Sequence, residues 1–97
     1  STLFPYTTLF RSTFAKFKEI VQSPAYKDQQ IMTKFEINMT ELSIIRCVSQ
    51  GLSNQSIADQ LFISESTVKH RLALLMERFG VQDRVQLAVL AAKNGIL

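Results

Sequence analysis

Residues 51–84 read GLSNQSIADQLFISESTVKHRLALLMERFGVQDR, and their pattern gives the clearest indication of the fold. Ser53 and Ser64 stand where helix N-caps are expected, because a serine hydroxyl can accept hydrogen bonds from the free backbone amides of a first turn. Gly80 can adopt the left-handed conformation that closes a helix. Between these signals, apolar residues recur at the three- and four-residue steps of one helix face. They are Ile57, Ala58 and Leu61, then Val68, Leu72, Leu75, Met76 and Phe79. The stretch therefore predicts two helices that meet at a tight corner.

A helix on the N-terminal side of this stretch is predicted to begin near Met39. Asn38 and Glu41 have the spacing of a capping box, in which each side chain satisfies a backbone amide of the other residue. Gly51 supplies the left-handed stop. The buried stripe is predicted to hold Ile44, Ile45 and Val48, with Cys47 at its flank, while Arg46, Ser49 and Gln50 face away.

A last helix is predicted on the C-terminal side. Asp83 and Gln86 form a capping pair at its start, and Gly95 ends it. Its apolar residues are Leu87, Ala88, Leu90 and Ala91. Two helices joined by a short turn, with one helix behind them and another closing the bundle, have the layout of a DNA-binding helix-turn-helix domain. Helical bundles without DNA use the same caps and stripes, so the periodicity alone leaves function open.

The predicted fold class is all-α, a four-helix bundle over residues 36–97 preceded by a helical linker at 13–35. Within the linker, Phe14, Phe17, Ile20 and Val21 follow a helical period up to Ser23 and Pro24, and a weaker helical stretch covers residues 25–35. Such a segment is a linker, the last helix of a neighbouring domain, or a dimerisation helix. The residues do not choose among these three.

The first 12 residues are predicted to be an artefactual tail. Residues 2–12, TLFPYTTLFRS, resemble the conceptual translation of a widely used sequencing adapter. The run follows no helical period and Pro5 interrupts it. On this interpretation the natural N-terminal domain is missing. The alternative is an apolar arm that docks on the bundle.

The net charge of +3 is not itself evidence for DNA binding. Residues 1–35 carry five basic and two acidic residues, whereas residues 36–97 carry six of each sign. The relevant basic residues are local to one stretch, namely Lys69, Arg71, Arg78 and Arg84. Arg78 in this stretch and Lys93 beyond it are predicted to be solvated surface residues.

Several function classes find no support in the residues. A single cysteine, Cys47, cannot form an internal disulfide, and there is no cysteine or histidine cluster for zinc. No metal or cofactor is expected. The single histidine, His70, has no nucleophile or metal partner in evidence, so an enzyme is not predicted. No apolar run is long enough to span a bilayer, and the chain is predicted to be cytoplasmic.

Residues 51–84 closely resemble the LuxR-type helix-turn-helix, the effector domain of NarL/FixJ response regulators. The resemblance extends from about residue 37 to 96. It rests on matches in register at Gly51, Ser53-Asn54, Ile57-Ala58, Leu61, Ile63-Ser64, Thr67-Val68-Lys69, Gly80-Val81 and Arg84. The chain departs from the family where Thr40 replaces a common arginine, where Gln55 and Ser56 replace lysine and glutamate, and where the histidine is shifted to His70 ahead of Arg71.

The resemblance implies that the third helix of the bundle enters the major groove of DNA. Lys69 and His70 would then face base edges, since lysine suits guanine O6 and N7 and histidine can donate or accept. Ala73 at the same face could touch only a thymine methyl. The residues implied to contact phosphates are Asn54, Gln55, Ser64, Ser66, Thr67, Arg71 and Arg84. Arg71 is alternatively a residue whose stem packs beneath the turn, and Arg84 is alternatively a surface charge.

The resemblance also implies partners. Double-stranded DNA is the ligand, and an outward stripe of Val85, Val89 and Ala92 is the hypothesised contact of a homodimer on DNA, unless the missing domain covers it. RNA polymerase is a further partner, and the compartment is the bacterial cytoplasm at the nucleoid. The predicted function is a sequence-specific transcriptional regulator, the effector part of a truncated two-component response regulator.

Two alternatives remain at this level. One is a helical protein-interaction module that has lost DNA binding, favoured by the neutral charge of residues 36–97. The other is a domain like region four of a sigma factor, which lacks support from the Thr67-Val68-Lys69 and Gly80-Val81 pattern. Salt dependence separates DNA binding from protein binding, because phosphate contacts give a steep slope of log affinity on log salt.

Overall fold

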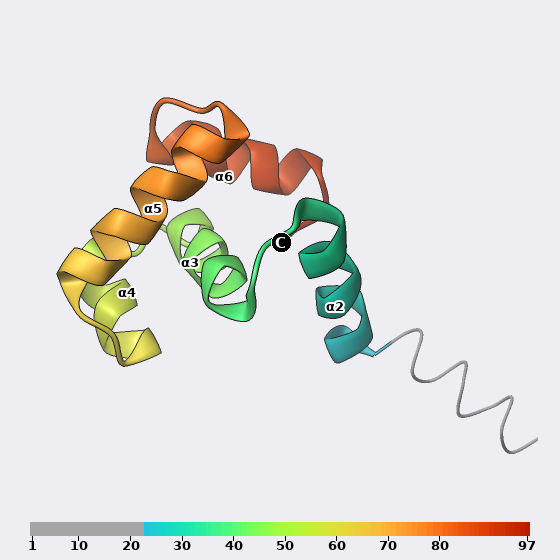
Figure 1. Cartoon of the computed structure of the whole chain (residues 1–97), viewed down its shortest axis with the longest axis horizontal. Helices are drawn as coiled ribbons and strands as arrows, with labels where there is room; N and C mark the ends of the chain where they lie inside the picture. The colour runs from blue at the N-terminus through green and yellow to red at the C-terminus, as the bar shows by residue number, and fades with distance from the viewer. Residues whose placement is uncertain (1–22) are drawn as a thin grey trace, which may run out of the picture.

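The computed structural model describes residues 23–97, and this part of the chain consists of five α-helices without a strand (Figure 1). They are α2 (Pro24–Phe35), α3 (Met39–Ser49), α4 (Asn54–Leu61), α5 (Glu65–Phe79) and α6 (Arg84–Lys93). The all-α prediction is confirmed. The predicted tail at 1–12 and the helical stretch before Ser23 lie outside the described residues. No helix of the described part is long and apolar enough to cross a membrane.

The helices begin where the sequence places their caps. Asn38 Oδ1 accepts from Glu41 N at 2.8 Å and Glu41 Oε1 accepts from Asn38 N at 3.0 Å, which is the predicted capping box. The hydroxyls of Ser53 and Ser64 accept from the amides of the residues three positions on. Each helix start is thus fixed by side chains of its own first turn.

One cap differs from the prediction in detail. Asp83 accepts from Gln86 N at 2.8 Å as expected. The Gln86 side chain, however, accepts from Gln82 N at 2.7 Å, one residue before the expected Asp83 amide. The start of α6 is still satisfied from both sides, so the helix begins where the sequence predicts.

The core surrounds α3, which packs against α4, α5 and α6. Figure 1 shows α3 in the centre, with α4 and α5 on one side and α2 on the other. Leu42, Ile44 and Ile45 are fully buried, and Leu75 and Leu87 meet them from α5 and α6. The predicted stripes are confirmed at their centres. Other stripe residues are only half-buried, namely Leu61, Met76, Phe79, Ala88 and Leu90.

Helix α2 is docked on the bundle. Its residues Ile31, Met32 and Phe35 pack against the core, and its Asp28 accepts a hydrogen bond from Arg46 at 2.8 Å. Arg46 Nε also donates to the Ile96 carbonyl at 3.0 Å. The prediction that Arg46 faces away is therefore wrong, because α2 and the C-terminal turn cover that side of α3. The weak helical stretch predicted at 25–35 is confirmed as α2.

Arg78 is exposed, as predicted for a surface residue, but it is not an isolated charge. Its Nη2 donates to the carbonyl of Phe35 at 3.0 Å and to that of Glu36, at the C-terminal end of α2. The carboxylates of Glu36 and Glu41 lie 3.6 and 3.9 Å from the guanidinium. Basic side chains favour a helix C-terminus because the last carbonyls have no partner in the helix. Arg78 thereby joins α5 to α2.

The Asp28–Arg46 pair predicts that docking of α2 is sensitive to acid. The hydrogen bond from Arg46 holds the pKa of Asp28 below its ordinary value, against the smaller opposing effect of burial. Because the folded pKa is lowered, the pair stabilises fully above about pH 4, and this stability is lost as the pH falls through the folded pKa. Both groups are partly exposed, so we expect Asp28→Asn to cost about 0.5–1 kcal/mol at pH 7 and less at an acidic pH below about 4. Urea denaturation at both pH values measures the difference, and an equal cost at both would contradict it.

Candidate nucleic-acid interface

The first turn of α5 is held by hydroxyl groups. Ser64 Oγ accepts from Thr67 N at 3.1 Å and lies 2.7 Å from Thr67 Oγ1 and 3.4 Å from Ser66 Oγ. The preceding Phe62 has a left-handed backbone at φ +57° and a side chain that is 94% exposed. Ser64, predicted as a phosphate contact, is thus the N-cap of α5, and its hydroxyl is engaged within the chain.

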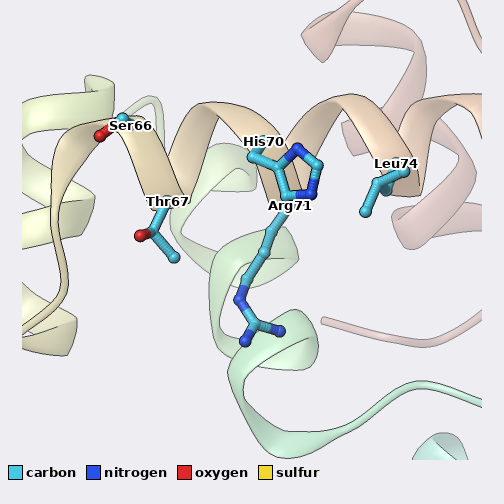
Figure 2. Close-up of a pocket in the computed structure, with 5 residues that line it drawn as sticks. All are labelled: Ser66, Thr67, His70, Arg71 and Leu74. Carbon is cyan, nitrogen blue, oxygen red and sulfur yellow. The ribbon is translucent and has the colours of Figure 1, made fainter.

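The outward face of α5 forms a shallow hollow. It is lined by Ser66, Thr67, His70, Arg71 and Leu74. Figure 2 shows His70 and Leu74 along the helix and Arg71 extending away from it. The structure therefore brings together four of the residues predicted to contact DNA, on one side of one helix.

Arg71 differs from the other arginines of the described residues. Arg46 and Arg78 are bound to α2, and Arg84 is bound to the segment at the start of α4. Among residues 23–97, Arg71 makes no hydrogen bond or ion pair, although the residue is half-buried. Arginine in such a position can offer its planar donors to an external phosphate.

Lys69 and Ala73 are exposed on α5 but do not line the hollow. Lys69 Nζ lies 3.7 Å from Glu65 Oε1, and the two side chains are 63% and 49% exposed. An exposed pair at this spacing on a helix is weak, so Glu65 does little to restrain the lysine. Lys69 remains able to reach a ligand in front of α5.

Two further predicted phosphate contacts, Asn54 and Arg84, meet at the start of α4. Arg84 Nη1 donates to Asn54 Oδ1, and Arg84 Nη2 donates to the Leu52 carbonyl. Both residues were predicted to contact phosphates directly, whereas here they bind each other. Gln55, the next residue of α4, is exposed.

Leu74 is the residue of this face that the sequence interpretation missed. It is 50% exposed and lines the hollow with His70 and Arg71. A signal was present, since Leu74 lies between the stripe positions Leu72 and Leu75 and so projects away from the core. An apolar side chain there suits contact with sugar or methyl groups.

The proposed dimer stripe lies on α6. Val85 is 71% exposed, Val89 is 46% exposed, and Ala92 is exposed. Val85 and Val89 share a shallow, largely apolar hollow with Val81 and Leu90. The described residues thus leave this stripe uncovered.

No metal site is found in the described residues, where no three histidine, cysteine or acidic side chains lie together. Cys47 is buried, and burial raises the pKa of its thiol. A raised pKa lowers the thiolate fraction, so Cys47 suits a place in the core better than redox chemistry.

Comparison with known proteins matches the same region. The model of the family described as "Bacterial regulatory proteins, luxR family" matches residues 36–91. The uncharacterized transcriptional regulatory protein YxjL of Bacillus subtilis is 42% identical over 57 residues, which are 59% of this chain and 26% of that protein. The DNA-binding transcriptional activator DevR/DosR of Mycobacterium tuberculosis is 38% identical over 53 residues, 55% of this chain and 24% of that protein.

A third likeness has lower identity and covers more of the chain. The HTH-type transcriptional regulator AlkS of Alcanivorax borkumensis is 28% identical over an alignment of 107 residues, covering 98% of this chain and 12% of that protein. The chain thus spans about a quarter or less of the length of these three relatives.

Proposed function

This chain belongs to the luxR family of bacterial regulatory proteins, and we propose that it recognises its DNA site through the outward face of α5. The family is one of DNA-binding transcriptional regulators and not of enzymes. Because the luxR family model matches residues 36–91, the luxR family and not a sigma factor accounts for this region. What remains to be assigned is the role of each side chain.

One observation carries the proposal, the unpaired guanidinium of Arg71 beside His70, Ser66 and Thr67. A half-buried guanidinium that pairs with no other described residue is available to an anion from outside. The hydroxyls of Ser66 and Thr67 add hydrogen-bond donors at the first turn of α5, where phosphate is favoured by the free amides. Arg71, Ser66 and Thr67 therefore position the helix on the DNA backbone.

The exposed residues of α5 next to Arg71, Ser66 and Thr67 contact the base edges. Lys69 is the main reader, through guanine O6 and N7, and His70 is the second. Ala73 and Leu74 offer only apolar contact, which suits a thymine methyl. The test is selection of sites from a random double-stranded DNA pool by the 97-residue chain. Enrichment of a common site containing guanine supports the assignment, and recovery of unrelated sequences contradicts it.

We further propose a homodimer on DNA through Val85, Val89 and Ala92 of α6. A two-fold contact would join like residues, and two copies would then bind half-sites about one helical turn, or a multiple of it, apart. Linked binding of this kind raises affinity roughly 100-fold over a single half-site. Titration of single and paired half-sites measures this gain, and equal affinity for both would contradict the dimer.

We propose that this chain is the effector part of a two-component response regulator, and that the whole regulator acts in the bacterial cytoplasm. The support is that the matched residues make up only about a quarter of YxjL and of DevR/DosR, so in these relatives the domain is one part of a longer regulator. The match to 12% of AlkS shows that the domain also occurs in much longer regulators. RNA polymerase is the further partner of this proposal, because a regulator bound near a promoter acts on transcription through the polymerase.

A protein-interaction module is the second candidate, since residues 36–97 carry equal numbers of basic and acidic residues. The arrangement of these charges argues against it. Arg46 and Arg78 bind acidic side chains of the chain itself, which leaves Arg71 unopposed on α5.

A further inference from the structure

Arg84 joins the start of α6 to the segment that leads into α4. Its two terminal nitrogens are both used, one by Asn54 Oδ1 and the other by the Leu52 carbonyl. The side chain is half-buried and lines a hollow shared with Gly51, Ser53 and Val48. Arg84 is therefore held inside a junction of three elements and does not project like Arg71.

This contact decides which way the Asn54 amide faces. A guanidinium has only donors, so the amide oxygen must point to it and the Nδ2 group must point away. The flipped amide would set two donors against each other and leave both without an acceptor. Among the described residues Asn54 Nδ2 has no hydrogen-bond partner, whereas its oxygen is held by Arg84.

We propose that Arg84 is a positioning residue, which holds the Asn54 amide with both Nδ2 donors directed toward a DNA phosphate. The inference rests on the proposed function, because it takes Asn54 as a contact to DNA. It replaces the expectation that Arg84 itself touches phosphate. Asn54 makes the contact, and Arg84 acts through it.

A double-mutant cycle on the 97-residue chain tests the coupling. Fluorescence anisotropy gives the affinity of the parent, Asn54→Ala, Arg84→Ala and the double variant for a duplex selected by the parent. Each single variant should lose about tenfold, the scale of one hydrogen bond to a charged group. The double variant should lose no more than either single one, because both remove the same contact. Losses that multiply would overturn the proposal.

Asn54→Asp separates positioning from a structural role. A carboxylate can still accept from Arg84, so the tie between α4 and α6 and the melting temperature should be kept. It has no donor to offer, so affinity for DNA should fall at least as far as in Asn54→Ala. Retained affinity in Asn54→Asp would overturn the proposal. Arg84→Lys, which keeps one donor toward Asn54, should recover part of the affinity lost in Arg84→Ala, and no recovery would count against it.

Two further readouts report on the atoms themselves. The Asn54 side-chain amide resonances should shift when DNA is added to the parent, and should not shift in Arg84→Ala. The slope of log affinity on log salt should stay close to that of the parent in Arg84→Ala, whereas direct phosphate contact by Arg84 would lower it by about 0.9. A parent that does not bind DNA would overturn the proposed function together with this inference. A parent that binds, with a slope lowered in Arg84→Ala, would overturn this inference alone.

Discussion

Lys69→Ala should remove most of the discrimination among DNA sites. Lys69 is exposed on α5, and only a weak pair with Glu65 restrains its ammonium group. A side chain that reads a guanine contributes about 1–3 kcal/mol on the preferred site, which is roughly 5- to 150-fold in affinity. The fold should be unchanged, because the side chain contributes nothing to the core.

Lys93→Ala is the matched control, since it removes the same charge from the exposed end of α6. Competition titrations with the selected site and with a site altered at its guanine give the two affinities for each variant. We expect the ratio of the affinity for the selected site to that for the altered site to fall toward one in Lys69→Ala and to stay unchanged in Lys93→Ala. A ratio that is unchanged in Lys69→Ala would remove Lys69 from the base-reading residues.

Leu75→Ala should have the largest effect on stability. Leu75 is fully buried on the side of α5 that meets the core, so its loss leaves a cavity in a small domain. Such substitutions cost about 2–5 kcal/mol, against a total stability of about 5–15 kcal/mol. Binding of DNA should weaken as the folded fraction falls on heating.

Leu74→Ala is the control on the adjacent residue of the same helix. Leu74 is 50% exposed, and we expect a cost below about 1 kcal/mol. Urea denaturation followed by circular dichroism compares the two variants. Equal losses of stability would show that α5 does not turn Leu75 inward and Leu74 outward.

The helices were predictable from the sequence because their determinants are local. Asn38, Ser53, Ser64 and Asp83 each cap a helix through a residue three positions on, so the signal lies within a few letters. The stripes of apolar residues follow the same short period. Only the degree of burial at some stripe residues differed from the prediction. It depends on how many neighbouring helices cover the stripe, which is not a local property.

The arginines were predicted less well because their partners are distant in the chain. Arg46 binds Asp28 and Ile96, and Arg78 binds the end of α2, in each case across many residues. No spacing rule relates such positions. With residues 13–35 predicted as a linker, neither Arg46 nor Arg78 has an acceptor within reach of a local pattern.

In the candidate site, too, the features set by nearby residues were predictable and the contacts between distant residues were not. The placement of His70 on the outward face of α5 follows from helical period and from the family resemblance, whereas Arg71 was open between a phosphate contact and packing beneath the turn. That Arg84 would bind Asn54 follows from neither, since it depends on how α6 packs beside α4. Arg71 emerges as the arginine without a partner in the described part of the chain only after the partners of Arg46, Arg78 and Arg84 are known.

The central claim is that the outward face of α5 binds DNA phosphates through a cation that the fold leaves free. The most direct test is the salt dependence of affinity for the selected duplex in the parent and in Arg71→Ala. We predict that log affinity falls linearly with log salt in the parent and that the slope is smaller by about 0.9 in Arg71→Ala, the amount expected for one lost phosphate contact. A parent affinity that does not change with salt, or an unchanged slope in Arg71→Ala, would contradict the claim.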